Sequence, residues 1–211
     1  RLLAAIGISA AILYFLLRYF VLETQKIKEQ LDQQHNLLVE EQKKSEHLLL
    51  NVLPTSIAQR LKENQGLIAD GHADVTVMFA DISNFTQMTE QMAPKEMVEL
   101  LNTIFTWFDS MSEKYGLEKI KTIGDAYMVV GGLTRNRVDY VKNIAEMALE
   151  MRDFVELHPE LARHNLGLHV GIATGPVVAG VIGTKRFIYD LWGDTVNVAS
   201  RLSDDGGRGD I

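Results

Sequence analysis

The sequence contains no cysteine. This absence excludes disulfide bonds, thiolate metal sites and cysteine nucleophiles. Any metal site must therefore use carboxylate, imidazole or backbone oxygen ligands. That set of ligands favours Mg²⁺, Mn²⁺ or Ca²⁺ over structural zinc.

The chain also lacks an excess of positive charge. Its 28 Asp and Glu residues outnumber its 21 Lys and Arg residues, which gives a formal net charge of −7. Non-specific binding to nucleic acid depends on neutralising phosphates with basic side chains. We therefore expect no nucleic-acid partner. The 211 residues, 46% of them hydrophobic, are enough to build a core.

The longest apolar run lies at residues 2–22, LLAAIGISAAILYFLLRYFVL, and Arg18 carries its only charge. About 20 apolar residues span the core of a bilayer, and Arg18, Tyr14 and Tyr19 suit its interface. We expect residues 1–22 to form a transmembrane helix. A cleaved signal peptide fits less well, because the run is long and no basic leader or small-residue cleavage site frames it. A buried core helix is the remaining alternative.

Lys26 and Lys28 follow this run. The positive-inside tendency then places the rest of the chain in the cytoplasm. The expected location is the inner or plasma membrane, with the catalytic domain on the cytoplasmic side.

Residues 23–53 are rich in Gln, Glu and Lys. A spacing of four and three places eight residues on one seam, five of them apolar: Ile27, Leu31, Gln34, Leu38, Glu41, Ser45, Leu48 and Val52. This seam predicts a short parallel coiled coil. The alternative is a solvated single helix, which is marginal alone in water. Residues 54–73, beginning at Pro54, are expected to be a linker helix and loop.

From residue 74 to residue 211 the pattern is that of a globular domain. Apolar strand runs are expected at 75–80, 119–123, 126–130 and 166–173, and helical stripes at 97–111 and 141–155. The order is βαββαβ, which predicts an α+β, ferredoxin-like core.

This topology brings two aspartates together. Asp81 ends the first predicted strand, and Asp125 follows Gly124 at the tip of the predicted hairpin. The first strand should end beside that tip. Two neighbouring carboxylates repel unless a cation lies between them, and Asp pairs commonly hold Mg²⁺ that also binds substrate phosphates. If each Asp is considered alone, a turn or cap residue is a simpler interpretation than a metal ligand. The loop after Asp81, formed by Ile82, Ser83, Asn84, Phe85 and Thr86, could offer backbone N–H groups to a phosphate.

Four segments, in this order, resemble the class III nucleotidyl cyclases: FADISNFT at 79–86, EKIKTIGDAYM at 118–128, GIATGPVVAG at 171–180 and YDLWGDTVNVASR at 189–201. The resemblance covers roughly residues 48–202 and is closest to membrane-anchored, homodimeric adenylyl cyclases of bacterial type. It implies conversion of a nucleoside triphosphate to its 3′,5′-cyclic monophosphate and pyrophosphate.

The resemblance also implies roles for individual residues. Asp81, Ile82 and Asp125 would form the site of two Mg²⁺ or Mn²⁺ ions. Asn197 would orient the ribose, and Arg201 would stabilise charge at the α-phosphate. Without the motif, the last two residues would be read as part of a surface helix with an ion pair or cap.

The resemblance assigns recognition of the base to Lys121 and Asp190. A Lys donor with an Asp acceptor fits adenine, so ATP is the expected substrate; guanylyl members usually carry Glu and Cys there. In isolation these residues would be an exposed strand lysine and a turn carboxylate. Lys185 and Arg186 are candidates for binding the triphosphate.

In the family each site is shared between two chains, and this chain carries both sets of residues, so a symmetric homodimer is expected. The resemblance further implies a segment ending in a triphosphate-binding lysine, and the sequence to Ile211 lacks it, so the catalytic domain is expected to be incomplete at its C-terminus. Two alternatives stay open: a guanylyl cyclase and a non-catalytic nucleotide-binding scaffold. A diguanylate cyclase is disfavoured, because the hairpin lacks a glycine-rich acidic turn of that type.

Overall fold

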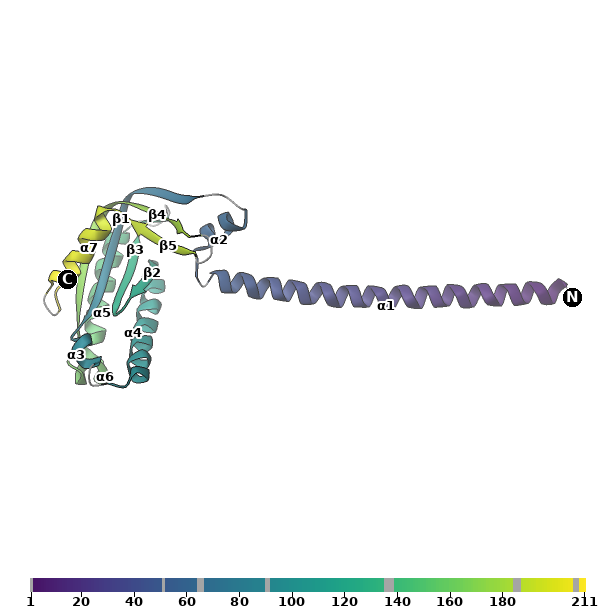
Figure 1. Cartoon of the computed structure of the whole chain (residues 1–211), viewed down its shortest axis with the longest axis horizontal. Helices are drawn as coiled ribbons and strands as arrows, with labels where there is room; N and C mark the ends of the chain where they lie inside the picture. The colour runs from purple at the N-terminus through teal and green to yellow at the C-terminus, as the bar shows by residue number, and fades with distance from the viewer. Residues whose placement is uncertain are drawn as a thin grey trace. The chain divides into compact units, whose positions relative to one another are not determined.

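The structure is a computed structural model that describes residues 2–50, 52–63, 67–89, 92–134, 139–183, 187–206 and 209–211. The side chains of residues 2–12 and of Thr86 lie outside this description. The chain divides into two compact units, Arg1–Gln65 and Gly66–Ile211, whose elements are labelled in Figure 1.

The first unit consists of two helices. Helix α1 (Leu2–Leu50) contains 49 residues, and α2 (Thr55–Lys62) follows Pro54. Lys62 of α2 forms an ion pair with Glu46 of α1 at 2.5 Å. The apolar residues of the predicted coiled-coil seam, such as Ile27 and Leu38, are exposed in the single chain. The coiled coil stays a prediction, because such a seam is buried only by a second helix.

Within the part of the chain that the structure describes, no helix is long and apolar enough to cross a membrane. The predicted span at residues 1–22 falls in large part on residues whose side chains are outside that part. The transmembrane helix therefore also stays a prediction.

The second unit is built on a five-stranded sheet in the order β2-β3-β1-β4-β5 (Figure 1). The strands are β1 (Ile68–Ser83), β2 (Glu118–Ile123), β3 (Ala126–Gly131), β4 (Gly167–Ile182) and β5 (Ile188–Trp192). All four neighbouring pairs are antiparallel. The first four strands have the order that the βαββαβ pattern predicts, and β5 is added beside β4.

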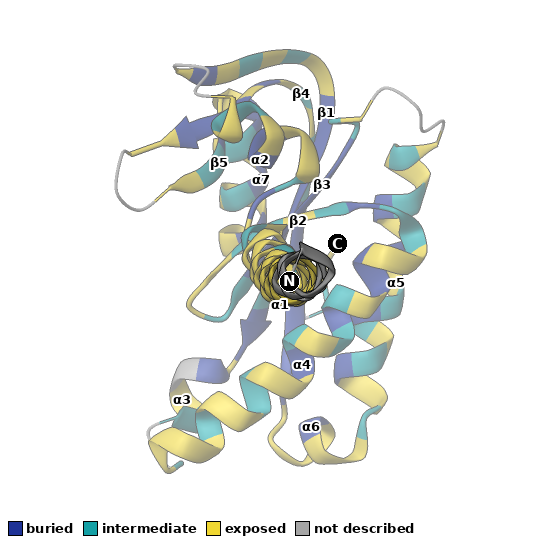
Figure 2. Cartoon of the chain, turned by 90° about the vertical axis from the view of Figure 1, so that its right-hand side faces the viewer, coloured by how far each residue is buried: buried dark blue, intermediate teal, exposed yellow. Residues whose placement is uncertain are grey.

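The remaining helices are α3 (Phe85–Thr89), α4 (Pro94–Tyr115), α5 (Tyr140–Leu157), α6 (Pro159–Arg163) and α7 (Asp194–Asp205). Alternate residues of a strand face opposite sides of a sheet. Met78, Ala80 and Ile82 of β1 thus join a first core cluster with residues of α4 and α5. Val75, Val77 and Phe79 join a second cluster with residues of β5 and α7. Figure 2 shows the buried residues along β1 and β3 and the exposed outer sides of α4 and α5.

The central strands are longer than the apolar runs that predicted them. β1 begins at Ile68 rather than near residue 75, and β4 continues to Ile182 rather than ending near residue 173. The added parts pair with each other beyond a register shift between His72 and Val75. The polar sequence before Val75 carries no strand signal, and in β4 a Gly-Pro pair separates the predicted strand from the run at 177–182, which is rich in β-branched residues. The segment expected to be linker up to residue 73 thus contains the start of β1.

Candidate active site

Asp81 and Asp125 lie where the topology predicted. Asp81 pairs in register with Ala126, the residue after Asp125. In the hairpin turn Gly124 has a φ of +62°, whereas Asp125 is not among the residues with a positive φ. Glycine therefore provides the left-handed conformation of the turn. The turn does not require an aspartate at this position, so the carboxylate of Asp125 needs another explanation.

The Asp81 carboxyl is in an unfavourable environment for a negative charge. Burial raises its pKa, and so does the charge of Asp125; the backbone N–H of Ile82 has the opposite effect, as does His169. His169 lies directly opposite Asp81 on β4. Asp204 of α7 adds further negative charge.

One oxygen of Asp81, Oδ1, is buried and has no hydrogen-bond partner among the described residues. Buried polar atoms are normally satisfied, and an exception often marks the place of an ion or a water. A divalent cation would both satisfy this oxygen and relieve the repulsion from Asp125. The described residues contain no group of three or more His, Cys, Asp or Glu side chains that could hold a metal. The residues therefore fit a cation that takes its other ligands from backbone oxygen, water or phosphate.

The segment after Asp81 is not the open loop that the sequence suggested. β1 extends to Ser83, and Asn84 has a φ of +63° before α3 begins at Phe85. Ile82 and Phe85 are buried in the first core cluster. The Ser83 hydroxyl is buried and has no hydrogen-bond partner within the described part of the chain.

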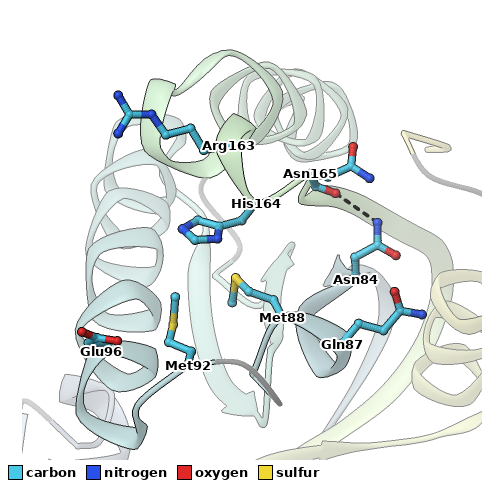
Figure 3. A pocket seen from close by; sticks show the side chains of 8 residues that line it. All are labelled: Asn84, Gln87, Met88, Met92, Glu96, Arg163, His164 and Asn165. Carbon is cyan, nitrogen blue, oxygen red and sulfur yellow. Dashed lines mark hydrogen bonds between the residues drawn. The ribbon is translucent and has the colours of Figure 1, made fainter.

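The side chain of Asn84 forms a hydrogen bond within the chain. Its Nδ2 donates a hydrogen bond of 3.0 Å to the backbone oxygen of Asn165, as Figure 3 shows. Asn84 also lines an open pocket of about 570 Å³ beside α3, α4 and the residues that follow α6. The side chain of Thr86, and all of Lys185 and Arg186, lie outside the described residues, so their predicted phosphate contacts stay predictions.

Lys121 and Asp190 meet although their strands lie at opposite ends of the sheet order. Lys121 Nζ lies 2.5 Å from Asp190 Oδ2, and the two side chains are 34% and 15% exposed. Asp190 Oδ1 also accepts a hydrogen bond from the backbone N–H of Leu191. The structure thus brings together the two residues predicted to read the base.

A β-bulge directs Lys121 to this position. Lys119 lies opposite Val129 and Lys121 lies opposite Met128, so Ile120 is the extra residue in β2. Val129 belongs to the first core cluster and Met128 to the second. With strict alternation Lys121 would share the face of Lys119. The bulge moves Lys121 to the face of β5 and α7, which is a common use of bulges near functional sites.

Asn197 and Arg201 lie on the exposed side of α7. Neither side chain has a hydrogen-bond or ion-pair partner within the described part of the chain. Thr195, Ala199 and Ser203 form the buried side of the same helix. A spacing of four puts Asn197 and Arg201 on one face, as predicted, where both can reach a ligand.

Glycines of β4 allow α7 to lie close to the sheet. A Cβ atom on Gly171 would lie 2.0 Å from the backbone oxygen of Ala199, and one on Gly175 would lie 2.6 Å from Oγ1 of Thr195. Side chains at these positions would push α7 away. Gly171 and Gly175 therefore fix the height of Asn197 and Arg201 above the sheet.

Three residues near the site were missed in the sequence. His169 lies on β4 directly opposite Asp81 of β1, and this position could have been found by pairing the two apolar strands. Glu118 and Tyr189 each begin one of the matched segments, but neither residue type suggested a role. The pKa of Tyr189 is raised by burial and by the nearby Glu118, which places the two side chains together.

The chain is similar to known proteins of one family. Residues 67–211 match the family described as "Adenylate and Guanylate cyclase catalytic domain". The chain is 41% identical over 209 residues to an "Adenylate cyclase" of Mycobacterium tuberculosis; the match covers 99% of this chain and 45% of that protein. The chain thus spans less than half the length of this curated relative.

Two solved structures are also similar. The catalytic core of a rhodopsin-guanylyl cyclase "with converted specificity in complex with ATPalphaS" is 34% identical, with a TM-score of 0.63 over 67% of this chain and 77% of that one. The adenylyl cyclase CyaB of P. aeruginosa is 28% identical, with a TM-score of 0.61 over 67% of this chain and 76% of that one. The family match covers most of the chain, and this chain therefore belongs to the adenylate and guanylate cyclase catalytic domain family, the class III nucleotidyl cyclases.

Proposed function

We propose that this chain is an adenylyl cyclase that converts ATP to 3′,5′-cyclic AMP and pyrophosphate. The pair of Lys121 and Asp190, in contact at 2.5 Å, is the observation on which this proposal depends. Adenine presents a donor at N6 and an acceptor at N1, and guanine presents the reverse pattern. A Lys donor beside an Asp acceptor matches adenine, whereas guanine would leave these partly buried groups unpaired.

Asp81, Ile82 and Asp125 would hold two Mg²⁺ or Mn²⁺ ions. The unsatisfied Oδ1 of Asp81 and its repulsion from Asp125 support this assignment. When bound, the ions would lower the pKa of the ribose 3′-OH and neutralise the phosphates. The two carboxylates would fix where the triphosphate lies, because Asp81 lies within β1 and Asp125 lies in the tight turn between β2 and β3.

Asn197 and Arg201 would act on the reacting part of the substrate. Arg201 presents a permanent positive charge, which suits the negative charge that develops at the α-phosphate. The amide of Asn197 would hold the ribose through hydrogen bonds. Their exposure on α7 leaves both side chains available to a nucleotide bound outside the chain's own core.

The active form would be a symmetric homodimer in which each site takes its metal ligands from one chain and Lys121, Asp190, Asn197 and Arg201 from the other. Large apolar residues on β4 and β5 support an interface in this region. Val178, Ile182, Ile188 and Trp192 are 42%, 56%, 57% and 37% exposed. Such a cluster of exposed apolar side chains commonly marks a protein contact.

The N-terminal unit would anchor and pair the chains. Helix α1 continues without interruption from Leu2 to Leu50, so a membrane span could pass directly into a coiled coil. The catalytic unit would then face the cytoplasm. A rotation of the paired helices could change both sites together. Insertions of one to four residues in α1 should then change activity with the period of a helix, whereas activity that ignores helical phase would contradict this role.

The activity itself is tested by incubating the purified chain with Mn²⁺ and either ATP or GTP and identifying the cyclic product. We expect cyclic AMP from ATP, with at least a tenfold lower yield of cyclic GMP from GTP. Formation mainly of cyclic GMP would support the guanylyl alternative, which the family description also includes. Binding of ATP without any product would support the scaffold.

A further inference from the structure

A second contact joins the strands that carry the base-reading residues. Glu118 lies opposite Val130 on β3, and Lys121 lies opposite Met128. Both partners belong to the second core cluster, so Glu118 and Lys121 lie on the same face of β2. Tyr189 precedes Asp190 on β5 and packs against that cluster. β2 and β5 contact each other, and the Glu118 carboxylate accepts a hydrogen bond from the Tyr189 hydroxyl, so this pair connects the two strands beside Lys121 and Asp190.

Glu118 is poorly placed for a purely structural carboxylate. Its Oε1 is buried and has no hydrogen-bond partner among the residues that the structure describes. Burial raises the pKa of Glu118, and a hydrogen bond with the Tyr189 side chain partly offsets that effect. A buried carboxylate with one unsatisfied oxygen destabilises a fold. Residues that lower stability in this way are enriched at functional sites.

The ion pair of Lys121 and Asp190 needs a second contact to hold its two strands at a fixed distance. Lys121 has a long, flexible side chain on an edge strand, and Asp190 lies on the strand at the other edge. β2 and β5 are not adjacent in the sheet, so no ladder of backbone hydrogen bonds fixes the distance between them. Discrimination between adenine and guanine requires donors and acceptors held within about 0.5 Å. A buried side-chain contact between the two strands would provide that precision.

We propose that Glu118 is a positioning residue for base selection, which holds Tyr189 and thereby keeps Asp190 in place beside Lys121. This inference rests on the proposed adenylyl cyclase activity. It predicts that loss of the Glu118–Tyr189 contact weakens binding of the correct base more than it slows the chemical step. The reason is that Glu118 begins β2, at the end away from the turn that carries Asp125, whereas the residues that would act on the phosphates lie on α7.

The test uses the full chain and measures KM and kcat with ATP and with GTP for Glu118→Ala, Glu118→Gln and Tyr189→Phe. For Glu118→Ala and Tyr189→Phe we expect KM for ATP to rise about tenfold and the preference for ATP over GTP to fall similarly, with kcat within about threefold of wild type. Glu118→Gln should restore most of both values, because its amide oxygen still accepts from the Tyr189 hydroxyl. Lys119→Ala is the matched control, on the same strand but the opposite face, and should keep the wild-type preference.

An unchanged KM and base preference in a folded Glu118→Ala or Tyr189→Phe variant would overturn the inference. A fall in kcat at constant KM would overturn it too, because it would place Glu118 in the chemical step or in overall stability. If Glu118→Ala does not fold, Tyr189→Phe decides alone, since it removes a single oxygen. A wild-type chain that makes no cyclic AMP would refute the proposed function instead, so the two failures are distinguishable.

Discussion

The substitution Asp81→Asn should stabilise the metal-free chain while it abolishes activity. Burial and the charge of Asp125 raise the pKa of Asp81 above its ordinary value of 3.8. A carboxyl whose pKa is raised in the folded state favours folding while it is protonated, and that contribution is lost as the pH rises through the folded pKa. At neutral pH the ionised Asp81 therefore weakens the fold, and asparagine removes the charge at nearly constant shape.

The expected size follows from the charge of Asp81, because asparagine still places an unpaired polar atom at the position of Oδ1. A buried polar group without a partner costs about 1–3 kcal/mol, and a charged one costs more. Asp81 is only partly buried, so solvent screening reduces the gain from removing its charge to about 1 kcal/mol. For a chain of this size that corresponds to a rise in Tm of about 2–4 °C. The gain should shrink as the pH is lowered towards 3.8, because the wild-type carboxyl then becomes protonated as well.

Tryptophan fluorescence is a suitable assay, because both tryptophans, Trp107 and Trp192, lie in the catalytic unit. Melting is followed in EDTA and again with Mn²⁺. Metal at about 100 times its Kd stabilises the wild type by about 2.7 kcal/mol, and the variant should respond far less. Asp153→Asn, at a carboxylate of α5 that is 56% exposed, is the control and should change neither value. A variant that melts below the wild type in EDTA, or gains as much from Mn²⁺, would refute the reasoning.

Three further predictions concern the frame of the site. Gly171→Ala should lower both Tm and activity, because the Cβ of alanine would lie 2.0 Å from the backbone of α7. Overpacking of this kind lowers the free energy of unfolding by about 1–3 kcal/mol, which thermal melting would measure. Tyr127→Phe should lower the free energy of unfolding in urea by about 1 kcal/mol with little change in kcat, because it removes the hydroxyl that donates the 2.7 Å hydrogen bond to Asp109 of α4. Deleting Ile120 removes the bulge but leaves Lys121 opposite Met128, on the same face, so the preference for ATP over GTP should persist in the cyclase assay while the loss of the packed Ile120 side chain lowers Tm.

The topology could be predicted because it depends on patterns that the sequence carries openly. Strand and helix runs alternate with the right periods, and the order βαββαβ allows few arrangements. The order of the strands alone predicted that Asp81 lies beside the hairpin turn that carries Asp125. The register between Asp81 and Ala126 agrees with it.

Other parts of the site could not be predicted, for identifiable reasons. The bulge at Ile120 leaves no mark in the pattern, so the direction of Lys121 could not be derived from alternation. The polar start of β1 is held by pairing with β4 rather than by its own residues, and propensity does not reveal such long-range pairing. The contact between Glu118 and Tyr189 depends on how β5 approaches β2, which local sequence does not determine.

The shared active site is tested most directly by mixing two inactive variants. Asp81→Ala removes a metal ligand and Arg201→Ala removes the charge that would act at the α-phosphate, so each homodimer should produce no cyclic AMP. In a mixed dimer one of the two sites keeps every residue, and random pairing should restore about a quarter of the wild-type activity per chain. A mixture as inactive as its components, although the chains exchange and dimerise, would contradict the account.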